Sequence, residues 1–351
     1  MHDEQPKSSD SEFTLSPAYY TAAHRHELSL DEYFDGIRAG DFTVLARALT
    51  LVESGTPRHH LLAEELLTRL LPHTGGAIRL GITGVPGVGK STFIEALGLH
   101  LVRAGKRIAV LAVDPSSRLS GGSILGDKTR MPGLATQGAA YIRPSPSAGT
   151  LGGVARKTRE SMLVCEAAGY DVVLIETVGV GQSETMVADM SDCFIALMLP
   201  GAGDELQAVK RGLLELVDVI AVNKADGATR QAAEVAAQLY STALHSLVGR
   251  DDEAPQVVTC SALTNQGVDA IWEIVVRRHA KLKTGGVLAA RRQRQNLRWL
   301  WSMIDDRVQQ AVRTHPAVHA IRGELERGVL VGAIPPEAAA RQILEAFGIK
   351  W

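Results

Sequence analysis

The sequence has few cysteines, no long apolar run and no marked excess of charge of either sign. Its 351 residues include three cysteines, Cys165, Cys193 and Cys260, which lie far apart and without paired spacing. Because each lies in an apolar helix or strand pattern, we expect buried thiols rather than disulfides or metal ligands. The 37 basic and 39 acidic residues nearly balance, so the composition gives no indication of a nucleic-acid or membrane partner.

Apolar segments are short throughout the chain. No stretch approaches the roughly 18 consecutive apolar residues that a membrane-spanning helix needs, and the N-terminal segment is too polar for a signal peptide. We therefore expect a soluble, cytoplasmic protein. The length suits one large α/β domain with helical additions.

A phosphate-binding loop follows the first predicted strand. Residues 84–91 read Gly84, Val85, Pro86, Gly87, Val88, Gly89, Lys90 and Ser91. Glycines allow consecutive backbone N–H groups to turn toward a phosphate chain, and the following helix adds the positive end of its dipole. We expect Lys90 to contact the β- and γ-phosphates and Ser91 to hold Mg²⁺. The pattern predicts a nucleoside triphosphate as the ligand.

A second motif indicates which base is bound. The strand pattern over 218–223 ends at Asn223, and Lys224, Ala225 and Asp226 follow. The Asp226 carboxylate can accept hydrogen bonds from N1–H and the 2-amino group of guanine, whereas adenine offers no such donor pair. We expect Asn223 to tie this loop to the phosphate loop and the Lys224 stem to lie on the base. Backbone groups able to contact guanine O6 follow a further strand pattern, at Ser261, Ala262 and Leu263. The sequence favours GTP over ATP.

Acidic residues near two further strand ends are candidate magnesium ligands beside Ser91. Asp114 follows one apolar strand pattern and Glu176 ends another. A carboxylate at this edge of the sheet can hold Mg²⁺ directly or through water. Asp127 lies in a segment rich in glycine and serine, where it is either an outer ligand or a solvated loop charge. The predicted metal residues are therefore Ser91, Asp114, Asp127 and Glu176.

Hydrolysis requires an oriented water and donors for the developing charge. We consider Asp114 first and Glu176 second as the group that positions the water, so Lys90, Asp114 and Glu176 are the candidate catalytic residues. Gly179 leaves room for the γ-phosphate, whose backbone contact would order the loop that follows. No glutamine follows Gly179 directly, where some GTPases orient water. Slow intrinsic turnover is expected, which suits a switch.

Strand and helix patterns alternate between residues 78 and 283. The apolar strand patterns cover 78–83, 107–113, 140–143, 171–176, 193–199, 218–223 and 257–260. Continuous apolar character is typical of strands buried on both faces of a mainly parallel sheet. Because ligand loops lie at the carboxyl ends of such strands, the motifs above should meet at one edge. The sequence predicts an α/β nucleotide-binding fold.

Helical patterns flank this region on both sides. The N-terminal patterns cover 30–39, 42–53 after a cap at Asp41, and 59–71. We divide the chain into a disordered segment, an N-terminal helical region, the nucleotide-binding domain and a C-terminal helical arm, with bounds 1–28, 29–76, 77–285 and 286–351.

The arm carries an apolar stripe. Its members recur at helical spacing, at Leu297, Leu300, Trp301, Ile304, Val308 and Val312. A break at His315-Pro316 precedes two shorter helices, over about 317–328 and 337–347. The stripe either packs back onto the nucleotide domain or meets a second subunit, and we favour a homodimer because helices already cover both faces of the sheet.

Several strings together resemble the MeaB/ArgK family of GTPases, whose animal counterpart is the cobalamin A protein. They lie within 83–92, 114–130, 143–160, 174–184, 198–212 and 223–226. Glu176, where other GTPases have aspartate, is that family's own variant. The resemblance implies a P-loop GTPase fold of the signal-recognition-particle and MinD-like class, with nucleotide contacts over Gly84 to Thr92, at Asp226 and over 261–263. It also implies homodimers formed through C-terminal helices.

The family resemblance implies a partner as well as a ligand. Its members act as chaperones of adenosylcobalamin-dependent methylmalonyl-CoA mutase or its close relatives, where GTP binding and hydrolysis gate cofactor loading and protect the mutase. Two alternatives stay open. One is a kinase linked to basic amino-acid transport, and the other is a metal-delivering GTPase. Paired cysteines are absent and His59-His60 is the one adjacent histidine pair, so metal delivery has little support.

Overall fold

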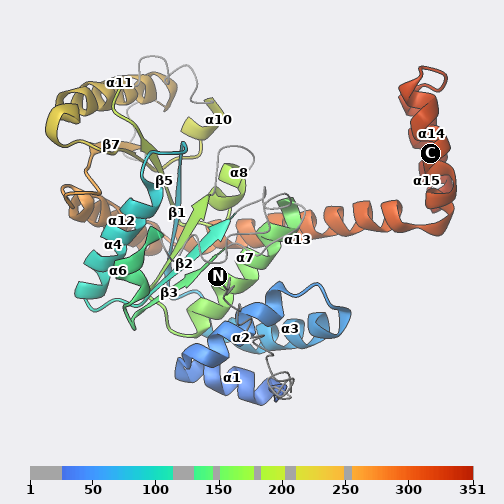
Figure 1. Ribbon diagram of the computed structural model, residues 1–351, viewed down its shortest axis with the longest axis horizontal. Helices are drawn as coiled ribbons and strands as arrows, with labels where there is room; N and C mark the ends of the chain where they lie inside the picture. The colour runs from blue at the N-terminus through green and yellow to red at the C-terminus, as the bar shows by residue number, and fades with distance from the viewer. Residues whose placement is uncertain are drawn as a thin grey trace, which may run out of the picture.

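A parallel β-sheet forms the centre of the protein (Figure 1). The computed structural model describes residues 26–113, 130–144, 151–177, 183–201, 211–248 and 255–350. Its strands are β1 (Ile78–Gly84), β2 (Ile108–Val113), β3 (Ala140–Arg143), β4 (Val172–Thr177), β5 (Cys193–Met198), β6 (Val219–Val222) and β7 (Gln256–Thr259). They lie in the order β3-β2-β4-β1-β5-β6-β7, and every neighbouring pair is parallel. The predicted fold class is confirmed.

Alternate side chains of each strand enter two separate cores. In β4, Val172 and Leu174 face one core, whereas Val173 and Ile175 face the other. Strands buried on both faces need no polar alternation, which explains why the sequence shows them as unbroken apolar runs. The sheet is therefore fixed from both sides, and its carboxyl-terminal edge carries the predicted motifs.

Helices cover both faces of the sheet. The helices of the central region are α4 (Lys90–Arg103), α6 (Pro132–Ala135), α7 (Leu151–Ala167), α8 (Ser183–Ala188), α10 (Arg211–Leu214), α11 (Arg230–Val248) and α12 (Val268–Thr284). Short 3₁₀ turns cover Leu71–His73 and Gly227–Thr229. Helices α4, α6 and α12 pack on one face, whereas α7, α8 and α11 pack on the other.

The N-terminal helices share a core with the sheet. They are α1 (Leu30–Ala39), α2 (Phe42–Glu53) and α3 (Pro57–Leu70), and they pack against one another and against α7. As predicted, Asp41 caps α2, since its carboxylate accepts hydrogen bonds from two backbone N–H groups of the first turn. An ion pair between Glu53 of α2 and Arg143 of β3 joins this layer to the carboxyl-terminal edge of the sheet.

Three helix starts differ from the sequence-based prediction for one physical reason. The structure starts α3 at Pro57, α14 at Pro316 and α15 at Pro336, whereas we predicted starts at 59, 317 and 337. Proline fits the first position of a helix because its fixed φ is helical and the N–H that it lacks has no partner there. Each of these prolines belongs to its helix.

A long helix carries the C-terminal region away from the sheet. Helix α13 (Val287–Thr314) follows the Gly285–Gly286 turn, and α14 (Pro316–Leu330) and α15 (Pro336–Phe347) pack together at its far end (Figure 1). Arg292 anchors its root, donating hydrogen bonds to both carboxylate oxygens of Asp192 at 2.9 and 2.6 Å and to the carbonyl oxygens of Gly75 and Ala77. Gln295 adds a hydrogen bond of 2.9 Å to the Ser191 carbonyl oxygen.

The apolar stripe of α13 lies on the side opposite these anchors. Helical geometry, at 100° per residue, separates the anchors from the stripe by half a turn. We call the following residues, which are 39% to 59% exposed, the outer stripe: Leu297, Leu300, Trp301, Ile304 and Val308. The outer stripe does not pack on the body, so the interpretation of the stripe as an intramolecular cap is wrong for these five residues.

The cysteines are free and buried, as predicted. Burial raises the pKa of the Cys260 thiol to about 12 and also raises the pKa of Cys165 and Cys193. A thiol with a raised pKa stays protonated at neutral pH and is a poor nucleophile and metal ligand. Among the described residues, no helix is long and apolar enough to cross a membrane.

Candidate nucleotide site

The phosphate loop connects β1 directly to α4. Lys90 is the first residue of α4, and the buried Val88 side chain fixes the loop to the core. The Lys90 ammonium donates to the carbonyl oxygens of Gly84 and Val85 at 2.6 and 3.4 Å. Burial lowers the pKa of Lys90, an effect that the nearby Glu176 carboxylate opposes. A partly desolvated ammonium at the start of a helix is suited to an anionic ligand.

Two glycines of this loop have no room for a side chain. Gly84 has φ +152°, and a Cβ there would lie 2.5 Å from the Leu197 carbonyl oxygen. Gly89 has φ +95°, and a Cβ there would lie 2.8 Å from the Asn223 side-chain nitrogen. Both positions combine a backbone conformation that favours glycine with a close approach. Gly84 and Gly89 are therefore required by the fold of the loop.

Asn223 joins three loops at the carboxyl-terminal edge of the sheet. Its side chain is buried, at 2% exposed. Its amide nitrogen donates to the Val88 carbonyl oxygen at 2.8 Å, and its amide oxygen accepts from the Ala262 N–H at 3.0 Å. One side chain thus ties the phosphate loop to both candidate base-binding segments. This tie agrees with the one expected from the sequence and extends it to the segment after β7.

Lys224 and Asp226 follow Asn223 on the predicted base side of the site. Lys224 has φ +61°, and its ammonium reaches the phosphate loop, donating to the Gly87 carbonyl oxygen at 2.7 Å. The lysine stem therefore extends from the base motif to the phosphate motif. The Asp226 side chain is half-buried and accepts no hydrogen bond from any residue that the structure describes. Its carboxylate has both oxygens available for donors of a ligand.

Thr229 holds the base loop in shape, a role that the sequence motifs did not indicate. Its hydroxyl lies within hydrogen-bond distance of the carbonyl oxygens of Lys224 and Asp226, at 2.5 and 2.8 Å. Threonine often bonds nearby backbone groups at the start of a helix, and Thr229 directly precedes α11. The position of Thr229 just before a predicted helix was the one feature of the sequence that could have indicated this role.

The segment after β7 presents backbone groups toward the same edge. Ser261 is buried and its hydroxyl accepts the Thr264 N–H at 3.2 Å, while Ala262 is held by Asn223. Leu263 is 77% exposed. Gly267 closes this loop, since a Cβ there would lie 2.7 Å from the Thr259 carbonyl oxygen. The predicted segment 261–263 therefore lies beside the Asn223 loop.

Two of the predicted magnesium ligands meet in the structure. The Ser91 hydroxyl lies 3.5 Å from a carboxylate oxygen of the buried Glu176. Hydroxyl and carboxylate oxygens are the donors that Mg²⁺ prefers, so these two residues fit the ion. The described residues contain no cluster of three or more histidine, cysteine or acidic side chains able to hold a metal. Asp114, Asp127 and Gly179 lie outside the described residues.

Several known proteins that are similar to this chain are named as GTPases. The family described as "Methylmalonyl Co-A mutase-associated GTPase MeaB" matches residues 45–317. A "Putative GTPase" of Caulobacter vibrioides is 56% identical over 323 residues, covering 92% of this chain and 99% of that protein. "GTPase ArgK" of Escherichia coli is 51% identical over 284 residues, covering 81% of this chain and 86% of that protein.

Similarity extends to an animal protein and to a solved structure. The "Methylmalonic aciduria type A homolog, mitochondrial" of Mus musculus is 44% identical over 329 residues, covering 91% of this chain and 79% of that protein. The crystal structure of "LAO/AO transport system kinase" is similar with a TM-score of 0.72 at 41% sequence identity. The likeness covers 90% of this chain and 96% of that one.

Replacing Asn223 with alanine should weaken both the fold and the nucleotide site. The change leaves the Val88 carbonyl and the Ala262 N–H without their partner, at a cost of about 1–3 kcal/mol in the free energy of unfolding. Affinity for a fluorescent GDP analogue should fall about tenfold or more, because the phosphate and base loops are no longer joined.

Two further variants sharpen this test. Asn223→Asp keeps an acceptor for the Ala262 N–H but places a carboxylate against the Val88 carbonyl oxygen, so it should also lose affinity. Asn296→Ala alters an exposed asparagine of α13 and should behave as the unmodified protein. Undiminished GDP affinity in Asn223→Ala would contradict the assigned role.

Proposed function

The chain belongs to the MeaB family of GTPases, and we propose that it is a GTP-driven chaperone of an adenosylcobalamin-dependent methylmalonyl-CoA mutase or a close relative. The family match and the similarity to GTPase ArgK confirm the resemblance found in the sequence. They also confirm the expectation that the chain is a P-loop GTPase, which hydrolyses GTP. The mutase partner is inferred from the name of the family. In this proposal, GTP binding and hydrolysis gate cofactor loading and protect the mutase.

The observation that supports the nucleotide-binding part of this proposal is the Asn223 junction. It holds a phosphate loop and a free Asp226 carboxylate as parts of one site. We assign Asp226 to N1–H and the 2-amino group of guanine, the Lys224 stem to the face of the base, and backbone groups of Ser261, Ala262 and Leu263 to guanine O6. An acceptor that matches guanine would be left unpaired beneath a bound adenine, which gives strong discrimination.

Phosphate binding and hydrolysis are assigned to the remaining residues of the edge. Residues 84–92 surround the phosphates with their backbone N–H groups, which all of them except Pro86 possess, and Lys90 supplies positive charge to the β- and γ-phosphates. Ser91 and Glu176 would hold Mg²⁺, which neutralises phosphate charge when bound. Asp114 remains the first candidate and Glu176 the second for orienting water, while Asp127 and Gly179 are proposed as outer metal ligand and γ-phosphate neighbour.

The C-terminal arm supports a homodimer. The outer stripe repeats apolar residues at spacings of three and four along α13 and does not pack on the body of the protein. An apolar stripe on a projecting helix is suited to a second copy of the same stripe, related by two-fold symmetry. We propose that residues 286–351 form the dimer arm and that residues 77–285 form the GTPase domain.

Asp226→Asn should change which base is bound. An amide can accept from N1–H and donate to the C2 carbonyl oxygen of xanthine, but it cannot accept from both donors of guanine. Affinity for GDP should fall by about one to two orders of magnitude while affinity for XDP rises. Asp305→Asn on the exposed side of α13 is the matched control. Unchanged GDP preference in Asp226→Asn would exclude Asp226 as the base reader.

The proposed mutase partner is tested by adding the mutase to this protein and measuring GTP hydrolysis. GTP hydrolysis should accelerate when an adenosylcobalamin-dependent methylmalonyl-CoA mutase is added, and Lys90→Ala should abolish both the basal and the accelerated rates. The kinase alternative predicts instead that labelled phosphate passes from GTP to a basic amino acid or a protein. Such transfer, with no response to the mutase, would overturn the proposed function while leaving the nucleotide site intact.

The dimer is tested on the outer stripe. Trp301→Glu places a charge at its centre and should convert a dimer to a monomer in sedimentation velocity, because burying an unpaired charge is costly. Gln309→Glu adds the same charge on an exposed position beside the stripe and should leave the dimer intact. If the unmodified protein sediments as a monomer at micromolar concentration, the proposed role of the arm is wrong.

A further inference from the structure

The near-balance of total charge conceals one strongly basic region. Residues 274–304 contain eight lysines and arginines and no aspartate or glutamate. They form the second half of α12, the Gly285–Gly286 turn and the first part of α13. This corner lies at the amino-terminal edge of the sheet, beside the residues that begin β6 and β7. The nucleotide motifs lie at the opposite edge, so the basic corner is separate from the GTP site.

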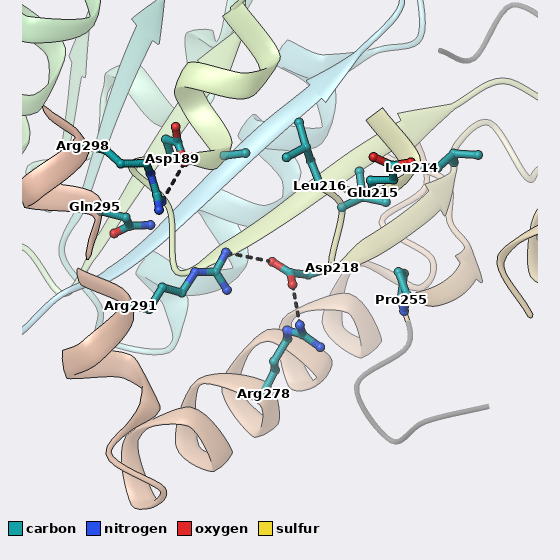
Figure 2. Close-up of a pocket in the computed structure, with 12 residues that line it drawn as sticks. Asp189, Leu214, Glu215, Leu216, Asp218, Pro255, Arg278, Arg291, Gln295 and Arg298 are labelled. Carbon is teal, nitrogen blue, oxygen red and sulfur yellow. Dashed lines mark hydrogen bonds and ion pairs between the residues drawn. The ribbon is translucent and has the colours of Figure 1, made fainter. Parts of the chain in front are cut away.

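Two adjoining cavities open on this corner. One, of about 290 Å³, lies between α12, α13 and the segment Leu214–Asp218 (Figure 2). The other, of about 210 Å³, lies along α12 and shares Asp218 and Arg278 with the first. Five cationic side chains line the pair, namely Arg277, Arg278, Lys281, Arg291 and Arg298. Three acidic side chains also line it, namely Asp189, Glu215 and Asp218, so positive charge exceeds negative charge.

Arg291 has hydrogen-bonding capacity that the protein does not use. Its side chain is 25% exposed, and its nearest carboxylate oxygen, Oδ2 of Asp218, is 3.7 Å away. That oxygen already accepts the Phe194 N–H at 2.8 Å, while Oδ1 of Asp218 binds Arg278. Within the part of the chain that the structure describes, Arg291 donates no hydrogen bond. Because largely buried guanidinium groups normally have partners, its donors point to a ligand.

Figure 2 shows how the charges are arranged around the larger cavity. Arg278 of α12 and Arg291 of α13 approach Asp218 from two sides, and Arg298 pairs with Asp189 at 2.9 Å further along α13. One carboxylate therefore faces two guanidinium groups. Arg277 and Lys281 are exposed and have no ion-pair partner among the described residues, and both line the second cavity. Among the described residues that line the two cavities, about two positive charges are left without a counter-charge.

We propose that the α12–α13 corner binds the phosphate group of a small molecule, with Arg291 as its principal ligand. A phosphate carries close to two negative charges at neutral pH and accepts hydrogen bonds from several directions, which matches donors on two helices. A guanidinium can bind it with two parallel N–H groups. Leu214, Leu216 and Pro255 also line the larger cavity, so an organic phosphate ester fits better than free phosphate.

The test uses the full chain saturated with GDP, which occupies the phosphate loop. Phenyl phosphate, benzoate and inorganic phosphate are titrated by calorimetry. Phenyl phosphate should bind saturably with one site per chain, and benzoate, its carboxylate counterpart, should bind more weakly. Weaker binding of inorganic phosphate would support an ester as the ligand, and equal binding would support free phosphate. A fluorescent GDP analogue that stays bound throughout would show that the GTP site is not involved.

Variants locate the site. Arg291→Ala should weaken phenyl phosphate about tenfold, the equivalent of one charge-assisted hydrogen bond, and Arg291→Lys should restore only part of the loss. Arg277→Ala tests the second cavity on an exposed residue and should also weaken binding. Arg294→Ala removes an exposed α13 charge that lines neither cavity and should have no effect. Each variant should bind GDP as the unmodified protein does, and this unchanged GDP affinity shows that the variant is folded.

Three results would overturn the proposal. The first is no saturable binding to the GDP-loaded protein. The second is equal loss of affinity in Arg291→Ala and Arg294→Ala, which would indicate a diffuse field instead of a site. The third is benzoate binding as tightly as phenyl phosphate. Asp251, Asp252 and Glu253 precede Pro255 in the sequence and lie outside the described residues. Because every variant retains these three residues, differences between the variants report only the substituted arginine.

Discussion

The amide of Asn223 is the interaction on which the nucleotide site depends. With one buried side chain it donates to the phosphate loop at Val88 and accepts from Ala262 after β7. The strands β1, β6 and β7 deliver these loops to one edge, but strand order alone does not set the spacing between them. The buried amide of Asn223 sets this spacing, because its nitrogen and its oxygen both have hydrogen-bond partners and leaving either one unpaired would cost free energy. The candidate phosphate-binding loop and the candidate base-binding loops thereby become a single structural unit.

Much of the candidate nucleotide site could be predicted from the sequence, because its parts depend on local backbone requirements. Gly84 and Gly89 occupy conformations that favour glycine, and the strands are apolar because both faces are buried. The helix starts at Pro57, Pro316 and Pro336 were missed by one or two residues, although proline is favoured there. Contacts between distant segments carried no local signal. The Arg292–Asp192 anchor of the arm and the Thr229 brace of the base loop became visible only in the structure.

The two edges of the sheet have different roles in this account. The carboxyl-terminal edge carries the candidate GTP site, while the amino-terminal edge anchors α13 through Arg292 and Gln295 and presents the basic corner. The arm therefore begins on the edge remote from the nucleotide and directs the outer stripe away from the body. This separation leaves the candidate nucleotide site, the proposed dimerisation surface and the proposed phosphate site on distinct surfaces of one chain.

The central claim is that one buried junction assembles a site that is selective for guanine. Calorimetric titration of the unmodified protein with GDP and with ADP, in matched buffer and at saturating Mg²⁺, tests it most directly. The account predicts one GDP bound per chain and at least about a hundredfold weaker binding of ADP. Equal affinities for the two nucleotides, or no binding of either, would contradict it.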